Sequence, residues 1–224
     1  MNDLNTDPDL TLAERAALVL RQDILTGRHA PGDRLGVVEL AQSLGMGSTP
    51  VREGLSRLVS QGLVVSIGRR GFRVSDTSRE DLEDLTLLRR LVEGEALRRS
   101  ISRGGDDWEA GIVAALHRLK SFVRREGLQA PEGHPDYDAL HKAFHLAMIS
   151  ACAAPRLLAT AVELYDQAYR YRRLMMTELK DPETFIRVHE DLAEVALSRD
   201  MARAEKLLGD HLETTLAYVY AQTG

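Results

Sequence analysis

Four of the seven histidines in this 224-residue chain are spaced as the ligands of a metal ion could be. His141 and His145 are four residues apart in "YDALHKAFHLAM", so a helix would present both on one face. His189 and His211 lie about nine residues before and about eleven residues after the turn "SRD". Because a helix rises 1.5 Å per residue, they reach similar heights in an antiparallel pair. The spacing therefore predicts that imidazoles from three helices converge on one point.

Imidazole nitrogens bind zinc and nickel well, so the pattern predicts a site for a divalent metal, with zinc or nickel as the ion. Four neutral ligands would leave the full +2 charge on the ion, and that charge would attract an anion. The alternative is a structural role, because a histidine pair at this spacing is more often exposed or hydrogen-bonded within a core. The sequence has no His-Glu-x-x-His motif, so a hydrolytic role is not indicated.

A second group of residues has the chemistry to contact double-stranded DNA. The net charge of the chain is −5, yet residues 45–75 contain five arginines and one glutamate. The segment "STPVREGLSRLVS" has helical period, and the first turn of such a helix can enter the major groove. The tip "GRRG" suits phosphate or minor-groove contact. The predicted DNA contacts are Ser48, Thr49, Arg52, Arg69, Arg70 and Gly71.

The segments around these residues predict a winged helix-turn-helix. Residues 11–27, 37–45 and 49–61 have helical period, "APGDRL" indicates a turn into a short strand, and "GLVVSIGRRGFRVSD" indicates a β-hairpin. Ala41, Gly45 and Val51 fall where a crossing helix pair needs small and apolar residues. An ordinary helical hairpin is the alternative, but it would leave two arginines at a glycine-bounded tip without a role.

One residue of the predicted recognition helix conflicts with helix propensity. Gly54 lies in the helix interior, where glycine costs about 0.5–1 kcal/mol relative to alanine. We therefore expect Gly54→Ala to stabilise the N-terminal domain. The exception would be a close backbone approach that leaves no room for a methyl group.

The rest of the chain predicts a bundle of about six helices. Every segment after residue 77 has helical period, and the breaks are "SRGGDD", "EGLQAPEGHPD", "CAAPR", "KDPET" and "SRD". Asp106 and Asp181 are suited to cap two of these helices. The predicted fold is mainly α, with a tail at residues 1–9, a winged helix-turn-helix at residues 10–76 and an antiparallel helical bundle at residues 77–224.

Composition limits where such a protein could act. Hydrophobic residues make up 44% and charged residues 28% of the chain, and no apolar run reaches the roughly 18 residues needed to span a bilayer. The acidic N-terminus does not have the features of a signal peptide. The single cysteine, Cys152, cannot form an intramolecular disulfide, which favours a reducing compartment. We expect a cytoplasmic protein without membrane contact.

The stretches "PGDRL", "TPVRE" and "RLVSQGLV" together resemble the DNA-binding domain of GntR-family transcription regulators, and the helical remainder resembles the FadR-type effector domain, called FCD. The resemblance covers about residues 12–220. It implies a homodimer on a palindromic operator. Two positions where the family has DNA-contacting arginines are Ser48 and Val38 here, so we expect fewer charged contacts or a different sequence preference.

The resemblance also bears on the histidines. Many domains of this type bind a divalent metal through Asp, His, His and His; the last three match His145, His189 and His211, and His141 falls where the family has Asp. Arg89 matches the arginine that helps to bind the carboxylate of an effector. The resemblance therefore implies a ligand-responsive regulator that senses a small carboxylate and is not an enzyme. Two alternatives are a metal-dependent helical enzyme with a vestigial DNA-binding domain, and a binding module that no longer holds DNA.

Overall fold

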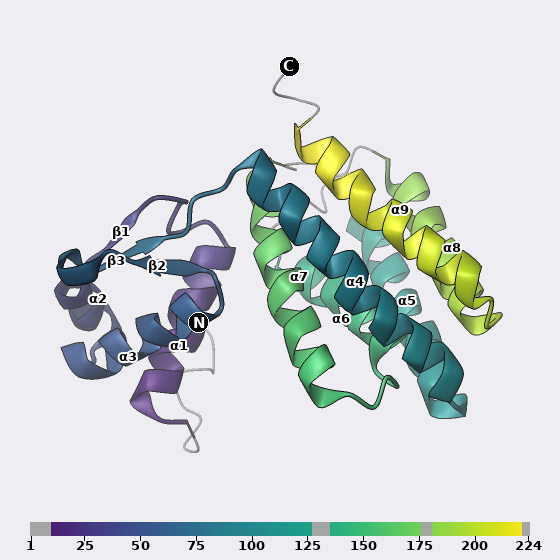
Figure 1. Cartoon of the computed structure of the whole chain (residues 1–224), viewed down its shortest axis with the longest axis horizontal. Helices are drawn as coiled ribbons and strands as arrows, with labels where there is room; N and C mark the ends of the chain where they lie inside the picture. Colours follow the sequence, from purple (N-terminus) through teal and green to yellow (C-terminus); the bar gives the residue numbers. More distant parts are fainter. Residues whose placement is uncertain (1–9, 127–134, 176–180, 221–224) are drawn as a thin grey trace. The chain divides into compact units, whose positions relative to one another are not determined.

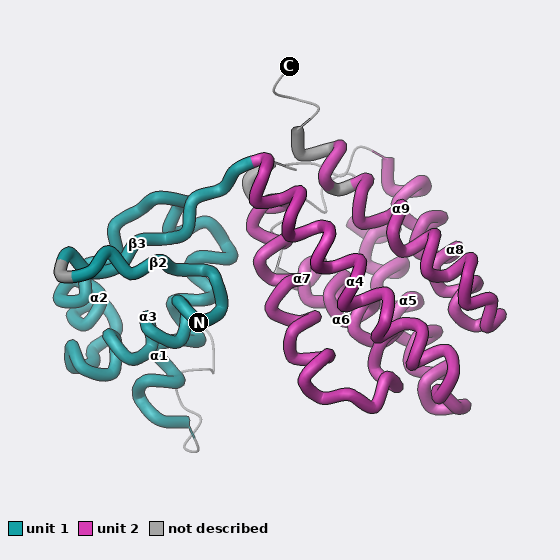
Figure 2. The backbone as a smooth tube through the Cα atoms, in the orientation of Figure 1, with its two compact units in different colours: residues 1–78 teal, residues 79–224 magenta. Residues whose placement is uncertain are grey.

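The computed structural model of this chain describes residues 10–126, 135–175 and 181–220. The chain folds as two compact units, Met1–Ser78 and Arg79–Gly224, which are coloured separately in Figure 2. The predicted tail at residues 1–9 lies outside the described residues. Among the helices in the described ranges, none is both long and apolar enough to cross a membrane.

The first unit contains the predicted helices and hairpin (Figure 1). Its three strands are β1 (Arg34–Leu35), β2 (Val64–Ser66) and β3 (Phe72–Val74). They form one antiparallel sheet in the order β1-β3-β2, in which Leu35 lies opposite Phe72 and Val64 lies opposite Val74. This arrangement is a winged helix-turn-helix, as the sequence predicts. In chain order the elements are α1 (Leu12–Leu25), β1 (Arg34–Leu35), α2 (Val37–Leu44), α3 (Ser48–Ser60), β2 (Val64–Ser66) and β3 (Phe72–Val74).

Local interactions determine where the first helices begin and end. α1 starts at a capping box, in which the backbone N–H of Glu14 donates to the Thr11 hydroxyl and the backbone N–H of Thr11 donates to the Glu14 carboxylate. α2 ends at Gly45, whose φ of 62° lies in the left-handed region that favours glycine. This sharp end separates α2 from α3 and makes the two a helix-turn-helix pair.

Gly54 is located where α3 crosses α1. A Cβ atom at this position would lie 2.9 Å from the backbone nitrogen of Ala17, 3.0 Å from the Cβ of Ala16 and 3.1 Å from the carbonyl oxygen of Ala13. Real Cβ atoms do not approach backbone atoms so closely, so the exception of a close backbone approach applies. The stabilisation expected from helix propensity is therefore corrected: the packing of α3 on α1 requires glycine.

The second unit consists, in its described residues, of six helices. They are α4 (Arg79–Arg103), α5 (Asp106–Glu126), α6 (Pro135–Ile149), α7 (Pro155–Met175), α8 (Pro182–Leu197) and α9 (Met201–Tyr220). Asp181 caps α8, because its carboxylate accepts hydrogen bonds from the backbone N–H groups of Glu183 and Thr184. Asp106 is instead the first residue of α5, where its negative charge complements the helix dipole.

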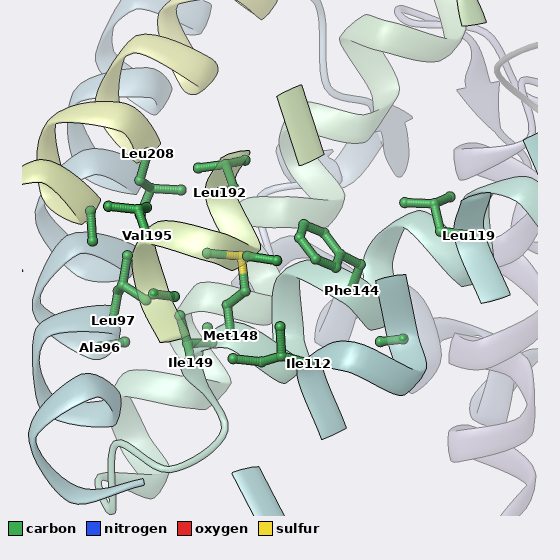
Figure 3. Packing of buried hydrophobic residues seen from close by; sticks show 14 of the residues in the cluster. Ala96, Leu97, Ile112, Leu119, Phe144, Met148, Ile149, Leu192, Val195 and Leu208 are labelled. Carbon is green, nitrogen blue, oxygen red and sulfur yellow. The ribbon is translucent and has the colours of Figure 1, made fainter. Parts of the chain in front are cut away.

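Apolar side chains from all six helices meet in one core, part of which is shown in Figure 3. Leu97 of α4, Ile112 of α5, Phe144 of α6, Leu192 of α8 and Leu208 of α9 are buried there. Ala161 of α7 joins the same cluster, whereas Leu164, Ala168 and Tyr171 of α7 pack with apolar residues of α4 in a second cluster. The core therefore ties α6, α8 and α9 together, and these are the three helices that carry the four histidines.

Candidate functional site

The structure brings all four histidines together inside the second unit. His141 and His145 come from α6, His189 from α8 and His211 from α9. One ligand nitrogen of each residue lies within 4.8 Å of the others. The Nε2 atoms of His141 and His189 are 3.0 Å apart, and those of His141 and His145 are 3.1 Å apart. We call these four residues the histidine cluster.

Aromatic side chains of the core hold the rings of the cluster in place. The ring of Phe144 on α6 lies 5.5 Å from that of His145 and 5.3 Å from that of His189, measured between centres. On α8 the ring of Phe185 lies 4.0 Å from that of His189. Because Phe144 is buried in the core, the packing that joins the helices also positions the imidazoles.

Burial keeps the imidazoles of the cluster neutral. Loss of contact with water is the largest cause that lowers the pKa of each ring below the usual value of 6.5, and it lowers the pKa of His189 to about 4. Neighbouring imidazoles or guanidinium groups lower these pKa values further. At neutral pH every ring therefore has a free lone pair, which is the form that binds a metal ion.

Two contacts orient the rings. The Nδ1–H of His189 donates to the carbonyl oxygen of Phe185 at 2.7 Å, which leaves its Nε2 lone pair directed toward the rest of the cluster. The Nδ1 of His141 lies 3.3 Å from the hydroxyl of Tyr165. Histidines that bind metals commonly have their second ring nitrogen held in this way, so the surroundings of the cluster resemble the outer shell of a metal site.

The donor atoms also fit the size of a metal ion. Zinc–nitrogen bonds of about 2.0–2.1 Å place the ligand atoms of a tetrahedral ion roughly 3.3–3.4 Å apart. The observed Nε2–Nε2 distances of 3.0 Å and 3.1 Å are slightly shorter, so a small outward movement of the rings would admit an ion. The cluster could therefore hold one metal ion.

Arg89, for which the resemblance implies effector binding, is buried on α4 beside a carboxylate. Its side chain is 3% exposed, and its Nε and Nη2 atoms lie 2.6 Å and 3.3 Å from the two carboxylate oxygens of Glu93. The guanidinium carbon of Arg89 lies 5.4 Å from the centre of the Tyr165 ring. Because the hydroxyl of that ring contacts His141, Arg89 lies close to the histidine cluster.

Tyr165 and Arg172 of α7 belong to the same site, and neither is among the residues predicted from the sequence. Both are buried, and the guanidinium carbon of Arg172 lies 4.8 Å from the centre of the Tyr165 ring. Their spacing of seven residues in "YDQAYRYR" places them on one helix face, and this spacing could have indicated that they act together. The sequence contains no indication that this face is directed toward the histidines of other helices.

The predicted contacts on α3 are available to DNA. Ser48 is the first residue of α3, and Ser48, Thr49 and Arg52 are all exposed. The first turn of α3 contains no acidic residue. Its free backbone N–H groups and the positive end of the helix dipole favour phosphate contact there. Val38 on α2 is 59% exposed, so an apolar side chain occupies this part of the surface.

The hairpin tip is a short 3-10 turn, Gly68–Arg70, closed by the backbone N–H of Ile67, which donates to the carbonyl oxygen of Gly71 at 2.8 Å. The φ angles of Gly68 and Gly71 are 53° and 101°, in the region that favours glycine. Arg70 is exposed. The side chain of Arg69 lies outside what the structure describes. The tip thus presents at least one arginine to solvent on a hydrogen-bonded turn.

Known protein families match both parts of the chain, the one with the predicted DNA contacts and the one with the histidine cluster. The family described as "Bacterial regulatory proteins, gntR family" matches residues 12–74, which span the helix-turn-helix and the hairpin. The FCD domain matches residues 84–214, which include the whole histidine cluster. The chain belongs to the gntR family and has an FCD domain. FCD domains often bind metals, in agreement with a cluster that could hold an ion.

Relatives of this gntR-family chain are described as regulators. It is 35% identical over 209 residues to the uncharacterized HTH-type transcriptional regulator BphR of Paraburkholderia xenovorans, covering 93% of this chain and 85% of that protein. It is 34% identical over 205 residues to the HTH-type transcriptional repressor GlaR of Escherichia coli, covering 89% of this chain and 92% of that protein. The chain is therefore a DNA-binding transcriptional regulator, and the enzyme alternative is dropped.

Solved structures include the same fold. The E. coli protein McbR/YncC superposes with a TM-score of 0.76 at 21% identity, over 96% of this chain and 100% of that chain. A putative transcriptional regulator GntR from Rhodococcus superposes with a TM-score of 0.71 at 22% identity, over 93% of this chain and 97% of that chain. At this level of identity the similarity establishes the architecture of the regulator.

Proposed function

We propose that this gntR-family chain is a cytoplasmic, homodimeric regulator that binds a palindromic operator and responds to a small carboxylate. Residues 10–76 would bind the operator, and residues 77–224 would bind the effector. A divalent metal ion, zinc or nickel, would be held by the histidine cluster. The observation that carries the proposal is the convergence of four neutral imidazoles from three helices within 4.8 Å, three of them buried and that of His211 partly buried.

Each histidine would have one task in holding the ion. His141, His145, His189 and His211 would direct nitrogen lone pairs to the centre of the cluster, while Phe185 and Tyr165 hold two of the rings in orientation. A bound ion would supply a positive charge that attracts an anion. No carboxylate belongs to the predicted ligand set, so none of the ligands would offset that charge. An anionic effector therefore suits this site better than a neutral one.

A carboxylate effector would also meet the guanidinium groups beside the cluster. The resemblance to the family assigns this contact to Arg89. A carboxylate accepts two parallel hydrogen bonds from a guanidinium, which makes such pairs both strong and selective for geometry. Metal and guanidinium together would therefore distinguish a carboxylate from ligands that carry only hydroxyl groups.

The operator contacts would come from the first turn of α3 and from the hairpin tip. Ser48, Thr49 and Arg52 would enter the major groove, while Arg69, Arg70 and Gly71 would lie against the backbone or the minor groove. Two copies of the chain related by a two-fold axis would contact the two halves of a palindrome. The serine at position 48 would reduce the charged contacts relative to the family pattern.

Effector and operator would be coupled through α4. α4 packs against both α7 and α9, so a ligand bound beside the cluster touches a helix that begins directly after the DNA-binding unit. A ligand that favours one arrangement of these helices would change the spacing of the two DNA-binding units in the dimer. Such coupling between two sites is typically worth about 1–3 kcal/mol, or roughly 5–150-fold in affinity.

Fluorescence anisotropy with the full chain tests this proposal. The probe is the DNA upstream of the chain's own gene, and scrambled DNA of equal length is the control. Zinc-loaded protein is expected to bind the probe specifically, and at least one of a panel of small carboxylates should change its affinity fivefold or more. Chelator-stripped protein should not respond. Binding that no carboxylate alters in either form, or no specific binding, would refute the proposal.

A further inference from the structure

We infer that two copies of this chain pair through exposed apolar side chains of α4, with the two α4 helices antiparallel across a two-fold axis. The inference rests on the proposed function, because it gives the interface of the homodimer that is proposed there. Leu87, Leu88 and Leu91 would form the centre of the interface, and we call these three residues the leucine patch. The partner of the patch would be the same patch on a second copy of the chain.

The leucine patch is an apolar surface that the fold of a single chain leaves open to solvent. The exposed fractions of Leu87, Leu88 and Leu91 are 56%, 49% and 63%. On the other side of α4, Leu85 and Leu97 are buried in the two apolar clusters of the unit. Apolar residues scattered singly over a surface are ordinary, whereas large side chains gathered on one face commonly mark an interface. The patch is therefore a candidate contact surface.

A hollow of about 500 Å³ lies beside the leucine patch, between α4 and α9, which run side by side (Figure 1). Leu87 and Leu216 line it, and the ion pair of Arg90 with Glu213 borders it. In an antiparallel pair of α4 helices, Leu91 of the partner subunit would lie opposite Leu87 and could enter this hollow. The surface thus combines a raised apolar patch with a recess, as contact between identical copies across a two-fold axis requires.

Charge is distributed along α4 so that the helix complements a reversed copy of itself. Residues 79–84 contain one arginine and four acidic residues, whereas residues 95–103 contain one glutamate and three arginines. All of these charged residues are at least partly exposed. Antiparallel pairing brings the acidic start of each helix to the basic end of the other, with Glu80 opposite Arg98 of the partner subunit. Parallel pairing would place like charges together, so the pattern favours a second copy in the antiparallel orientation.

The position of the leucine patch along α4 also suits the proposed operator binding. Pairing of Leu87 with Leu91 of the partner subunit places the two-fold axis at the level of Arg89, ten residues after α4 begins at Arg79. At 1.5 Å per residue, the starts of the two helices would be about 30 Å apart along the helix direction. Each helix begins directly after a DNA-binding unit, and the half-sites of a palindrome are commonly about 34–36 Å apart. The two separations are similar.

Light scattering coupled to size-exclusion chromatography of the full chain tests the interface. The double variant Leu88→Glu/Leu91→Glu should raise the Kd of the dimer at least a hundredfold, because it places unpaired charges at the centre of the contact. The matched control is Val113→Glu, which puts the same side chain at a 55% exposed apolar position of α5 and should change the Kd less than twofold. Circular dichroism and the melting temperature show whether each variant is folded.

Crosslinking tests the contact between the two helices directly. The single cysteine of the chain, Cys152, is buried, so a thiol introduced at the surface is the main target of a short bismaleimide. Leu88→Cys should give a covalent dimer, because position 88 lies next to the two-fold axis and therefore near its own copy in the partner subunit. Val113→Cys and the parent chain are the controls and should remain single chains under the same treatment.

The results separate this inference from the proposed function. A parent protein that is a single chain at micromolar concentration overturns the proposed homodimer, and this inference with it. A dimeric parent whose folded Leu88→Glu/Leu91→Glu variant stays dimeric overturns the inference alone, because another face then joins the copies. If that variant does not fold, the Leu88→Cys chain decides: a covalent dimer supports pairing through α4, and a chain that is not crosslinked overturns it.

Discussion

At the scale of single residues, His141 distinguishes this chain from the pattern it resembles. Sequence spacing and helical rise were enough to predict that His141, His145, His189 and His211 would meet, and the structure places their ligand atoms within 4.8 Å. The outer contacts could not be predicted in the same way. The packing of α4 and α7 brings three further residues to the site: Tyr165, Arg172 and Glu93. Contacts between separate helices leave no periodic pattern in the sequence, so these residues could not be predicted.

We predict that His141→Asp retains metal binding, because a carboxylate oxygen is also a ligand for zinc. His189→Ala, which removes a ligand from a different helix, should weaken zinc binding at least a hundredfold. His117→Ala on the exposed face of α5 is the matched control and should bind zinc as the parent does. Competition with a chromophoric zinc chelator measures all three. Loss of zinc by His141→Asp alone would show that the fourth nitrogen is required.

For DNA, we predict that Arg52→Ala abolishes specific operator binding, because Arg52 is the exposed cation in the first turns of α3. Arg70→Ala should weaken binding to all sequences and reduce the slope of log affinity against log salt by about one. Arg57→Ala is the control, because Arg57 pairs with Glu14 of α1 at 3.2 Å. Parent-like binding by correctly folded Arg52→Ala and Arg70→Ala in anisotropy would contradict the assignment of this surface.

At the scale of helices and strands, the sequence predicted which elements form and in what order better than it predicted which elements contact one another. Local chemistry identifies these elements. The spacing of hydrophobic residues indicates the helices, the glycines at the hairpin tip indicate the wing, and Asp181 marks the start of α8. Gly54 is a position that local chemistry does not explain. Its conflict with helix propensity was visible in the sequence, but the cause is the backbone of α1, more than thirty residues earlier in the chain.

We therefore predict that Gly54→Ala destabilises the first unit by about 1–3 kcal/mol, the usual cost of overpacking. Gly111→Ala is the control in α5, where an added Cβ meets no atom within 4 Å, and it should stabilise the second unit by about 0.5–1 kcal/mol. Urea unfolding followed by circular dichroism measures both. A Gly54→Ala protein at least as stable as the parent would show that α1 yields readily.

At the scale of the whole molecule, the proposed response to an effector requires two chains. Two copies of the winged helix must contact half-sites on the same face of the DNA, and a two-fold axis supplies that arrangement. We predict a solution mass of about twice the chain mass of 24.9 kDa. Light scattering coupled to size-exclusion chromatography measures it. A mass of one chain at micromolar concentration would contradict the homodimer.

Metal uptake by the purified full chain tests the central claim, that the histidine cluster is a metal centre. We predict one equivalent of zinc or nickel per chain by elemental analysis after dialysis. Removal of the ion by a chelator should lower the melting temperature, because a ligand bound only to the folded state stabilises it by about 2.7 kcal/mol when present at a hundredfold excess over its Kd. His211→Ala should lose both the ion and this stabilisation. A parent chain that takes up no zinc, nickel or manganese, or a His211→Ala chain that binds the ion as tightly as the parent, would contradict the claim.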